Sequence, residues 1–361
     1  MAFSGCSRLT SVYITDIAKW CDINFDDYYA NPLYYANNLY LNGNLVTELK
    51  IPNGITDIKS YAFSGCSSLT SITILDSVTG IGASAFEGCS RLASVTIGNS
   101  VKSISADAFE NCSNLTSVTI GNSVTSIGSS AFFGCYKLVE VINKSNLNIT
   151  KRYTNNGCVA YYALEVHKGK SKIVNKNGYL FYTTGGTNYL VNYIGTDNDI
   201  VLPENYNGEN YAIYKYAFYD NDNLTSVIIP DSVTSIGIYA FSNCSSLTSI
   251  TIGNSVTSIG DYAFYSCSSL TSVIIGNSVT SIGDWAFSSC SKLTNVTIGN
   301  SITSIGYRAF DDCSSLTSVE FKNTNGWKAG STAISSTDLA DKAKAATYLM
   351  SKYYKYTWTR N

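Results

Sequence analysis

The chain has 361 residues, charged residues make up only 14% of it, and its formal net charge is −2. This sparse, balanced charge argues against a nucleic-acid-binding surface and against attraction to anionic lipid. No apolar run approaches the roughly 18 residues that a membrane-spanning helix needs, so we expect no membrane insertion within this sequence.

One pattern of 23 residues recurs along the chain. It reads LTSITILDSVTGIGASAFEGCSR from Leu69 and LTSITIGNSVTSIGDYAFYSCSS from Leu247. A fixed period in this range is typical of a solenoid, in which one supersecondary unit stacks on copies of itself. The length alone would suggest two or three globular domains. The repeat instead predicts a fold that grows in one dimension.

Breaks in the period divide the chain into segments. The sequence opens with Phe3 and Cys6 in repeat phase, which we interpret as a repeat cut from a longer protein. Tyrosine-rich stretches and Gly-containing turns then mark two inserts, each with a predicted hairpin. A predicted helix over 339–353 indicates a cap on the open end of the stack. The predicted segments are a truncated repeat (1–14), an insert (15–45), repeat block 1 (46–142), a second insert (143–198), repeat block 2 (199–322) and a cap (323–361).

Within one repeat, apolar and polar residues alternate over Ser71–Ile74. The period of two predicts a strand whose isoleucines point inward and whose Ser71 and Thr73 point outward. Such a strand has no partner in its own coil, so it pairs with the same strand of the next coil and forms a parallel sheet. The Ala-Phe segment that follows, such as 83–86, predicts a short helical or 3₁₀ turn. Its phenylalanines are predicted to stack as an internal column.

The chain has eleven cysteines. Two of them, Cys21 and Cys158, lie outside the repeat phase, and the pattern leaves open whether they are free or paired. The others share one repeat position, three residues after an Ala-Phe pair, so we predict a column of small, buried, reduced side chains. These are Cys6, Cys66, Cys89, Cys112, Cys135, Cys244, Cys267, Cys290 and Cys313.

The repeat LxxI/VxI…VxxIGxxAFxxCxxL resembles the BspA-like, or Treponema-type, leucine-rich repeat. The resemblance implies an α/β-type solenoid that is predominantly β. Its parallel sheet would line the concave side and short helical or 3₁₀ turns the convex side. The usual rule for parallel crossovers predicts a right-handed superhelix. The resemblance also implies a bacterial cell-surface or secreted protein associated with adhesion, and it supplies no catalytic residues.

The sequence contains few of the residue patterns that are typical of an active site. His167 is the sole histidine of the sequence, which leaves few metal-site or triad arrangements. A Cys158–His167 dyad is formally available, but a loop histidine without a catalytic role is the simpler interpretation. Neither a P-loop nor a GxGxxG-bearing unit occurs. We therefore predict that the protein is not an enzyme, with no catalytic, cofactor-binding or metal-binding residue and no cofactor.

Two surfaces remain as candidates for ligand binding. One is the outward face of the sheet, which carries Ser71, Thr73, Thr96 and Thr119 in block 1; these residues are also good strand formers that keep a sheet soluble. The second is a row of large side chains directly before the Ala-Phe pairs of block 2. Aromatic residues are favoured anchors at interfaces and sugar sites, but these rings could instead seal the convex side. This row, called here the aromatic strip, consists of Tyr216, Tyr239, Tyr262 and Trp285, followed by Arg308.

The sequence as a whole therefore indicates a non-catalytic, extracellular or cell-surface adhesion or recognition module. We expect it to be a monomer that binds a protein or glycan and no nucleic acid. The alternative is a structural spacer or stalk of a larger surface protein, with no ligand of its own.

Overall fold

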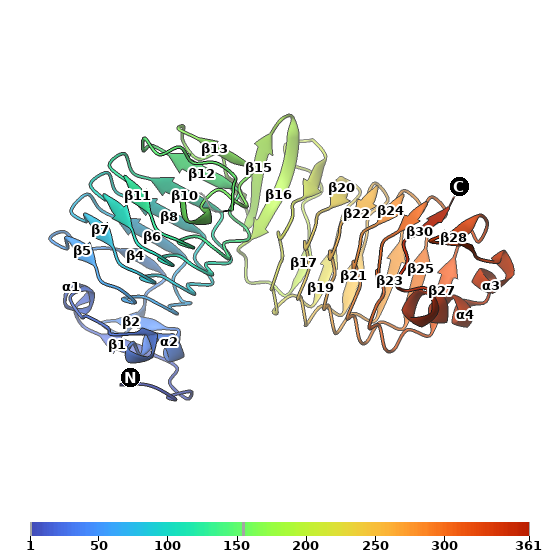
Figure 1. The fold of residues 1–361 in the computed structure, drawn as a ribbon, viewed down its shortest axis with the longest axis horizontal. Coiled ribbons are helices and arrows are strands. Elements are labelled where there is room, and N and C mark those ends of the chain that lie inside the picture. Colours follow the sequence, from blue (N-terminus) through green and yellow to red (C-terminus); the bar gives the residue numbers. More distant parts are fainter. Residues whose placement is uncertain (1, 154–155, 361) are drawn as a thin grey trace. The chain divides into compact units, whose positions relative to one another are not determined.

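The computed structural model describes residues 2–153 and 156–360. The chain divides into two compact units, unit 1 (Met1–Ile173) and unit 2 (Val174–Asn361). Each unit is a stack of coils in which equivalent strands of successive coils lie side by side (Figure 1). The boundary between the units falls inside the 143–198 segment, so the second insert is shared between them.

Unit 1 contains three sheets, and the largest runs in the order β13-β12-β10-β8-β6-β4. Its strands are β4 (Glu48–Lys50), β6 (Ser71–Ile74), β8 (Ser94–Ile97), β10 (Ser117–Ile120), β12 (Glu140–Asn143) and β13 (Glu165–His167). A second parallel sheet comprises β5 (Asp57–Ile58), β7 (Gly80–Ile81), β9 (Ser103–Ile104) and β11 (Ser126–Ile127). The third sheet holds β1 (Val12–Ile14), β2 (Leu39–Leu41) and β3 (Asn44–Leu45), the last two forming an antiparallel hairpin.

Unit 2 repeats this plan with two short parallel sheets and one long mixed sheet. The short sheets are β17 (Asp199–Val201), β19 (Ser226–Ile228) and β21 (Ser249–Thr251), and β23 (Ser272–Ile275), β25 (Asn295–Ile298) and β27 (Ser318–Phe321). The long sheet begins with β14 (Val174–Lys176) and the antiparallel hairpin of β15 (Tyr179–Thr184) and β16 (Thr187–Tyr193). It continues through β18 (Tyr211–Ile213), β20 (Val233–Ile236), β22 (Ser258–Ile259), β24 (Ser281–Ile282) and β26 (Ser304–Ile305), and ends with β30 (Trp358–Arg360), β28 (Trp327–Ala329) and β29 (Thr332–Ala333).

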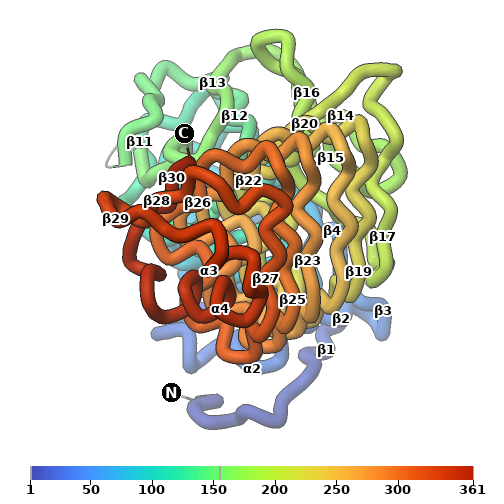
Figure 2. The backbone as a smooth tube through the Cα atoms, turned by 90° about the vertical axis from the view of Figure 1, so that its right-hand side faces the viewer, coloured from blue at the N-terminus to red at the C-terminus, as the bar shows by residue number. Residues whose placement is uncertain are grey.

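Helices are short and lie outside the regular coils. The first insert carries α1 (Ile17–Cys21), the 3₁₀ turn η1 (Tyr28–Ala30) and α2 (Leu33–Ala36), and the second carries η2 (Asn156–Cys158). At the end of unit 2, α3 (Ser336–Ala340) and α4 (Lys342–Thr347) lie against β27 (Figure 2). The π-helical turn η3 (Tyr348–Lys352) follows directly. Asp341 caps α4 by accepting from the N–H groups of Ala343 and Lys344. None of the helices in the described ranges is long and apolar enough to cross a membrane.

The phenylalanines of successive coils form two internal columns. In unit 1, Phe63 to Phe132 are fully buried and stack with ring centroids 5.1 to 5.4 Å apart. In unit 2 the column from Phe218 to Phe310 has separations of 4.7 to 5.3 Å. These separations are close to the spacing of hydrogen-bonded strands, so each ring covers the ring below it.

The predicted cysteine column is buried and reduced in all repeat coils except the first. Every buried thiol of the column after Cys66 donates to the carbonyl oxygen of the phenylalanine 26 residues earlier, at 3.1 to 3.3 Å. Cys66 instead pairs with Ser68 Oγ at 3.5 Å. Cysteine therefore ties adjacent coils together, a role that the sequence pattern did not indicate. The prediction was wrong for Cys6, which is exposed, because no described coil covers that side of the first repeat.

The Ala-Phe segments are successive turns closed by i to i+3 hydrogen bonds, such as Cys89 N–H to the Phe86 carbonyl. These bonds do not join into a continuous helix. In six coils a glycine that packs closely against the preceding coil comes before this segment, whereas Lys59, Ser105 and Tyr214 replace it in three others. A Cβ atom on Gly283 would lie 2.4 Å from the Asp261 nitrogen of the preceding coil. The prediction of a predominantly β solenoid with parallel sheets is confirmed.

Candidate functional site

The predicted hydroxyl surface of unit 1 forms an ordered array on the main sheet. Thr73, Thr96 and Thr119 lie in register on β6, β8 and β10, and Ser71 begins a parallel column of serines. Thr73 and Thr96 are exposed, whereas Ser71 and Thr119 are half-buried. The array is flat and uncharged, and it ends at β12, where buried Ile142 continues the threonine column.

The aromatic strip is a stack of rings. Ring centroids are separated by 5.1 Å between Tyr216 and Tyr239, 4.6 Å between Tyr239 and Tyr262, and 6.0 Å between Tyr262 and Trp285. The planes are within 10° of parallel, and all four residues are half-buried. Each ring therefore covers a face of its neighbour, and the strip offers ring edges rather than open faces.

The backbone holds these rings in an unusual conformation. All four strip residues have φ between 55° and 62°, a left-handed geometry that is rare for bulky side chains. It turns each N–H toward the next coil, so that Tyr262 donates to the Asp284 carbonyl at 2.8 Å and Trp285 donates to the Tyr307 carbonyl at 2.9 Å. The inter-coil hydrogen bonds offset the backbone strain. This conformation could not be predicted from the residue types, because non-glycine residues occupy the position in every coil.

Arg308 closes the strip and has its own intramolecular partners. Its guanidinium carbon lies 4.7, 5.2 and 5.4 Å from the ring centroids of Trp285, Tyr307 and Tyr354. The side chain also pairs with Asp311 at 3.2 Å. The cation is thus enclosed by aromatic rings of the protein itself. Arg308 links the last repeat to the C-terminal cap, a role that competes with ligand binding.

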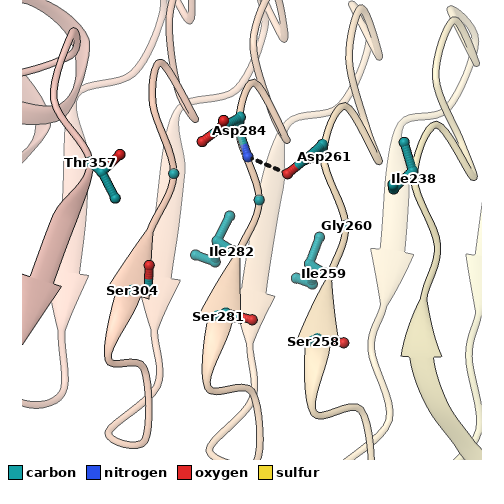
Figure 3. Close-up of a pocket in the computed structure, with 12 residues that line it drawn as sticks. Ile238, Ser258, Ile259, Gly260, Asp261, Ser281, Ile282, Asp284, Ser304 and Thr357 are labelled. Atoms are coloured by element: carbon teal, nitrogen blue, oxygen red, sulfur yellow. Dashed lines mark hydrogen bonds between the residues drawn. The ribbon is translucent and has the colours of Figure 1, made fainter.

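Beside the strip lies an open depression, shown in Figure 3. Ser258, Ser281 and Ser304 line it from β22, β24 and β26, in one register row. Above them, Asp284 N–H donates to Asp261 Oδ1 at 2.8 Å, and Asp284 Oδ1 in turn accepts from the Tyr307 N–H at 2.7 Å. One oxygen of each carboxylate therefore ties adjacent coils together. The depression is shallow and lacks the convergent donors that an enclosed small-molecule site needs.

The outward face of the unit 2 sheets carries apolar side chains that the sequence interpretation missed. Val201, Ile228 and Ile274 are 56%, 46% and 69% exposed. Val201 and Ile228 lie in register with Thr251, and Ile274 lies in register with Thr297. We call this set, with its threonines, the aliphatic row. The sequence indicates this exposed apolar position, because isoleucine replaces the usual threonine in Ser272–Ile275.

His167 belongs to a buried polar cluster at the end of the unit 1 sheet. Glu140 is fully buried and accepts from Ser117 Oγ at 3.0 Å, Ser171 Oγ at 2.6 Å and the Lys172 N–H at 2.7 Å. Because the Gly169 N–H donates to His167 Nδ1 at 3.0 Å, the ring proton lies on Nε2, which donates to Glu140 Oε1 at 3.0 Å. Both serines bond to the carboxylate and neither to the imidazole, so the geometry differs from a Ser-His-Asp triad.

The Cys158–His167 pairing does not form in this structure. The Cys158 thiol donates to the Tyr153 carbonyl at 2.7 Å, and burial raises its pKa, which disfavours the nucleophilic thiolate. Across the described ranges, no group of three or more His, Cys, Asp or Glu side chains is arranged to hold a metal ion.

The repeats of this chain are similar to those of known proteins. The chain matches the BspA type leucine rich repeat region in 6 copies, over residues 35–161 and 211–337. No curated protein matches. Among solved structures, a T. pallidum leucine rich repeat protein is 32% identical, with 41% of this chain and 70% of that one covered and a TM-score of 0.39.

Two further structures are similar to this chain. A leucine rich cell surface protein from Faecalibacterium prausnitzii is 24% identical, over 78% of this chain and 89% of that one, with a TM-score of 0.43. The pneumococcal vaccine antigen PcpA is 18% identical, over 92% of this chain and 82% of that one, with a TM-score of 0.41. None of these names specifies an enzymatic activity. Because the family match spans well over half of the sequence, the chain belongs to the BspA type leucine-rich repeat family.

Proposed function

We propose that this chain is a non-catalytic recognition module that acts at the cell surface or outside the cell and binds a protein ligand. Membership of a repeat family with a cell-surface protein among its structural relatives supports the location. The observation that carries the binding proposal is the aliphatic row, which exposes Val201, Ile228 and Ile274 on two neighbouring parallel sheets. Exposed apolar side chains grouped on one face are typical of protein interaction sites.

The chemistry of the aliphatic row favours a protein over a glycan. Its central members are isoleucine and threonine, and the charged residues Asp199 and Glu320 lie only on its end strands. Both have partners, since Asp199 accepts from Thr225 and Ser226 and Glu320 pairs with two lysines. Sugar binding commonly uses an open aromatic face, and the stacked strip covers the ring faces between neighbours. The ligand would therefore present uncharged, apolar side chains to unit 2.

The test compares variants on equivalent rows of the two units. The purified chain is applied to arrays of extracellular matrix proteins and of glycans, and affinity is then measured for any protein that binds saturably. Ile274→Lys should weaken that binding about 10- to 100-fold, because burying one isoleucine contributes roughly 1.5–3 kcal/mol. Thr73→Lys on unit 1 is the matched control and should leave the affinity unchanged.

Two outcomes would contradict the proposal. Equal losses for Ile274→Lys and Thr73→Lys would indicate a nonspecific charge effect. The absence of any saturable partner on either array would favour the structural spacer.

The aromatic strip is tested separately with Tyr262→Phe, which removes the hydroxyl group at the edge of the ring. Alanine is unsuitable there, because loss of a stacked, half-buried ring would also lower stability.

A further inference from the structure

Five tyrosines of unit 1 gather into one cluster where the first insert meets the repeat. We call Tyr28, Tyr29, Tyr34, Tyr35 and Tyr61 the tyrosine cluster. Ring centroids are 4.1 Å apart for Tyr28 and Tyr29, 4.9 Å for Tyr28 and Tyr34, and 5.1 Å for Tyr34 and Tyr35. Tyr61 occupies the repeat position of the aromatic strip and lies 6.4 Å from Tyr28. The following coils carry Ser84, Asp107 and Ser130 at that position, so no repeat ring covers Tyr61.

The insert beneath these rings is fixed in place. Asn31 is fully buried, and its amide nitrogen donates to the Tyr61 and Ala62 carbonyls at 2.6 and 3.2 Å. The Trp20 indole donates to the same Ala62 carbonyl at 2.9 Å. Asp27 Oδ1 caps the turn by accepting from the Ala30 N–H at 2.8 Å. The rings are thus preorganised, which lowers the entropy cost of binding a partner.

The cluster is acidic and lacks a cation of its own. A hydrogen bond with Tyr29 raises the pKa of Tyr28, and the nearby charge of Asp27 adds to this effect. Burial raises the pKa of Tyr34, and the nearby charge of Glu87 adds to it. Asp26, which directly precedes Asp27 in the chain, is exposed. Within residues 2–153 and 156–360, none of these three carboxylates has an ion-pair partner.

Several aromatic rings of unit 2 differ from the tyrosine cluster because a lysine or arginine lies over them. Among the described residues, every lysine or arginine that lies over a ring belongs to unit 2, including Arg308 over Trp285 and Lys352 over Tyr348. Electron-rich rings with nearby carboxylates attract a cation from two sources, the ring quadrupole and the negative charge. The tyrosine cluster of unit 1 has aromatic rings and nearby carboxylates, but among the described residues no lysine or arginine lies over its rings.

We propose that the tyrosine cluster is a docking surface for a basic protein segment, and that it receives a lysine or arginine side chain of the partner against Tyr34. Tyr34 is the outermost ring of the cluster, at 40% exposure, and it contacts Tyr28, Tyr29 and Tyr35. Charge complementarity selects the occupant, because Asp26, Asp27 and Glu87 repel an acidic segment. This surface lies in unit 1 and is independent of the aliphatic row in unit 2.

The experiment titrates the full chain with tetra-arginine and tetra-glutamate peptides by calorimetry. We expect saturable, weak binding of tetra-arginine and none of tetra-glutamate. Tyr34→Leu removes the ring and keeps apolar bulk, and should weaken tetra-arginine binding at least fivefold, whereas Tyr34→Phe keeps the ring and should bind nearly as well as the parent. Asp26→Asn should weaken binding and reduce its salt dependence.

The matched control is Tyr13→Leu, because Tyr13 is 68% exposed and stacks on Tyr40 at 4.7 Å outside the cluster. It should leave tetra-arginine binding unchanged. The proposal is overturned if tetra-arginine does not bind, if Tyr34→Leu binds as well as the parent, or if Tyr13→Leu loses as much. Ile274→Lys should bind the peptide normally, so failure of this proposal and failure of the proposed function are distinguishable. A thermal melt of Tyr34→Leu matching that of Tyr34→Phe excludes an effect through folding.

Discussion

Replacing Phe109 by alanine tests whether the stacked coils share one continuous core. Phe109 is fully buried and lies between Phe86 at 5.2 Å and Phe132 at 5.1 Å, with nearly parallel rings. Truncation removes a ring that is packed on both faces, and the rigid hydrogen-bonded coils on either side can collapse only slightly into the cavity. The expected loss is therefore near the upper end of the range for buried aromatic truncations, about 4–5 kcal/mol.

Phe133→Ala supplies the control from the same turn of the chain. Phe133 is half-buried, and its ring lies 6.0 Å from that of Tyr153 in an edge-to-face arrangement. Its truncation should cost about 1 kcal/mol or less. Both free energies come from equilibrium urea unfolding, and hydrogen exchange locates the loss in the coils that flank Phe109. Similar costs for the two variants would refute the assignment of inward and outward positions on which the whole fold depends.

Three further predictions follow from individual side chains. Burial raises the pKa of the Cys66 thiol to about 12 and raises the pKa values of Cys89, Cys112, Cys135, Cys267, Cys290 and Cys313 as well. At pH 8 a thiol reagent should therefore label exposed Cys6 quickly and the buried column only after unfolding. Rapid labelling of several thiols would contradict the buried column. Glu140→Ala leaves several donors without their acceptor. It should lower the free energy of unfolding of unit 1, measured in urea, by about 3–5 kcal/mol. A decrease of less than about 1 kcal/mol would show that water replaces the carboxylate. Hydrogen bonds and charge from Lys322 and Lys342 lower the pKa of Glu320 from 4.5 to about 2. The contribution of Glu320 to stability is therefore present above pH 4.5 and is lost as the pH falls toward 2. In an acid titration of stability, Glu320→Gln should lose less stability over this pH range than the parent.

The repeat determines the coil from sequence alone. Alternation over Ser71–Ile74 fixes which side chains face the core, and the structure buries Ile72 and Ile74 as expected. The period places equivalent phenylalanines one coil apart, so their stacking follows directly. These features depend on contacts that recur every 23 residues, and a local pattern is sufficient to specify them.

Other features depend on contacts that the period does not encode. The thiol-to-carbonyl hydrogen bonds of the cysteine column join one coil to the next, and no residue type indicates a positive φ at Tyr262 or Trp285. The sequence left open whether the aromatic strip is a contact surface or a layer of rings that lie over neighbouring coils, and in the structure these rings stack on one another. The exposed aliphatic row is encoded in the sequence by Ile274 in a threonine position, but the consensus of the repeat predicts a hydroxyl side chain there.

The sequence by itself determined the coil, its inward and outward faces and the family, because these arise from short-range alternation repeated at a constant interval. Only the tertiary structure brought Glu140 together with Ser171, and Tyr28 together with Tyr61. Those groups join an insert to a repeat coil, or a loop to a strand far away in sequence. The path of an irregular segment is set by burial and hydrogen bonding in three dimensions, so no periodic pattern could have specified it.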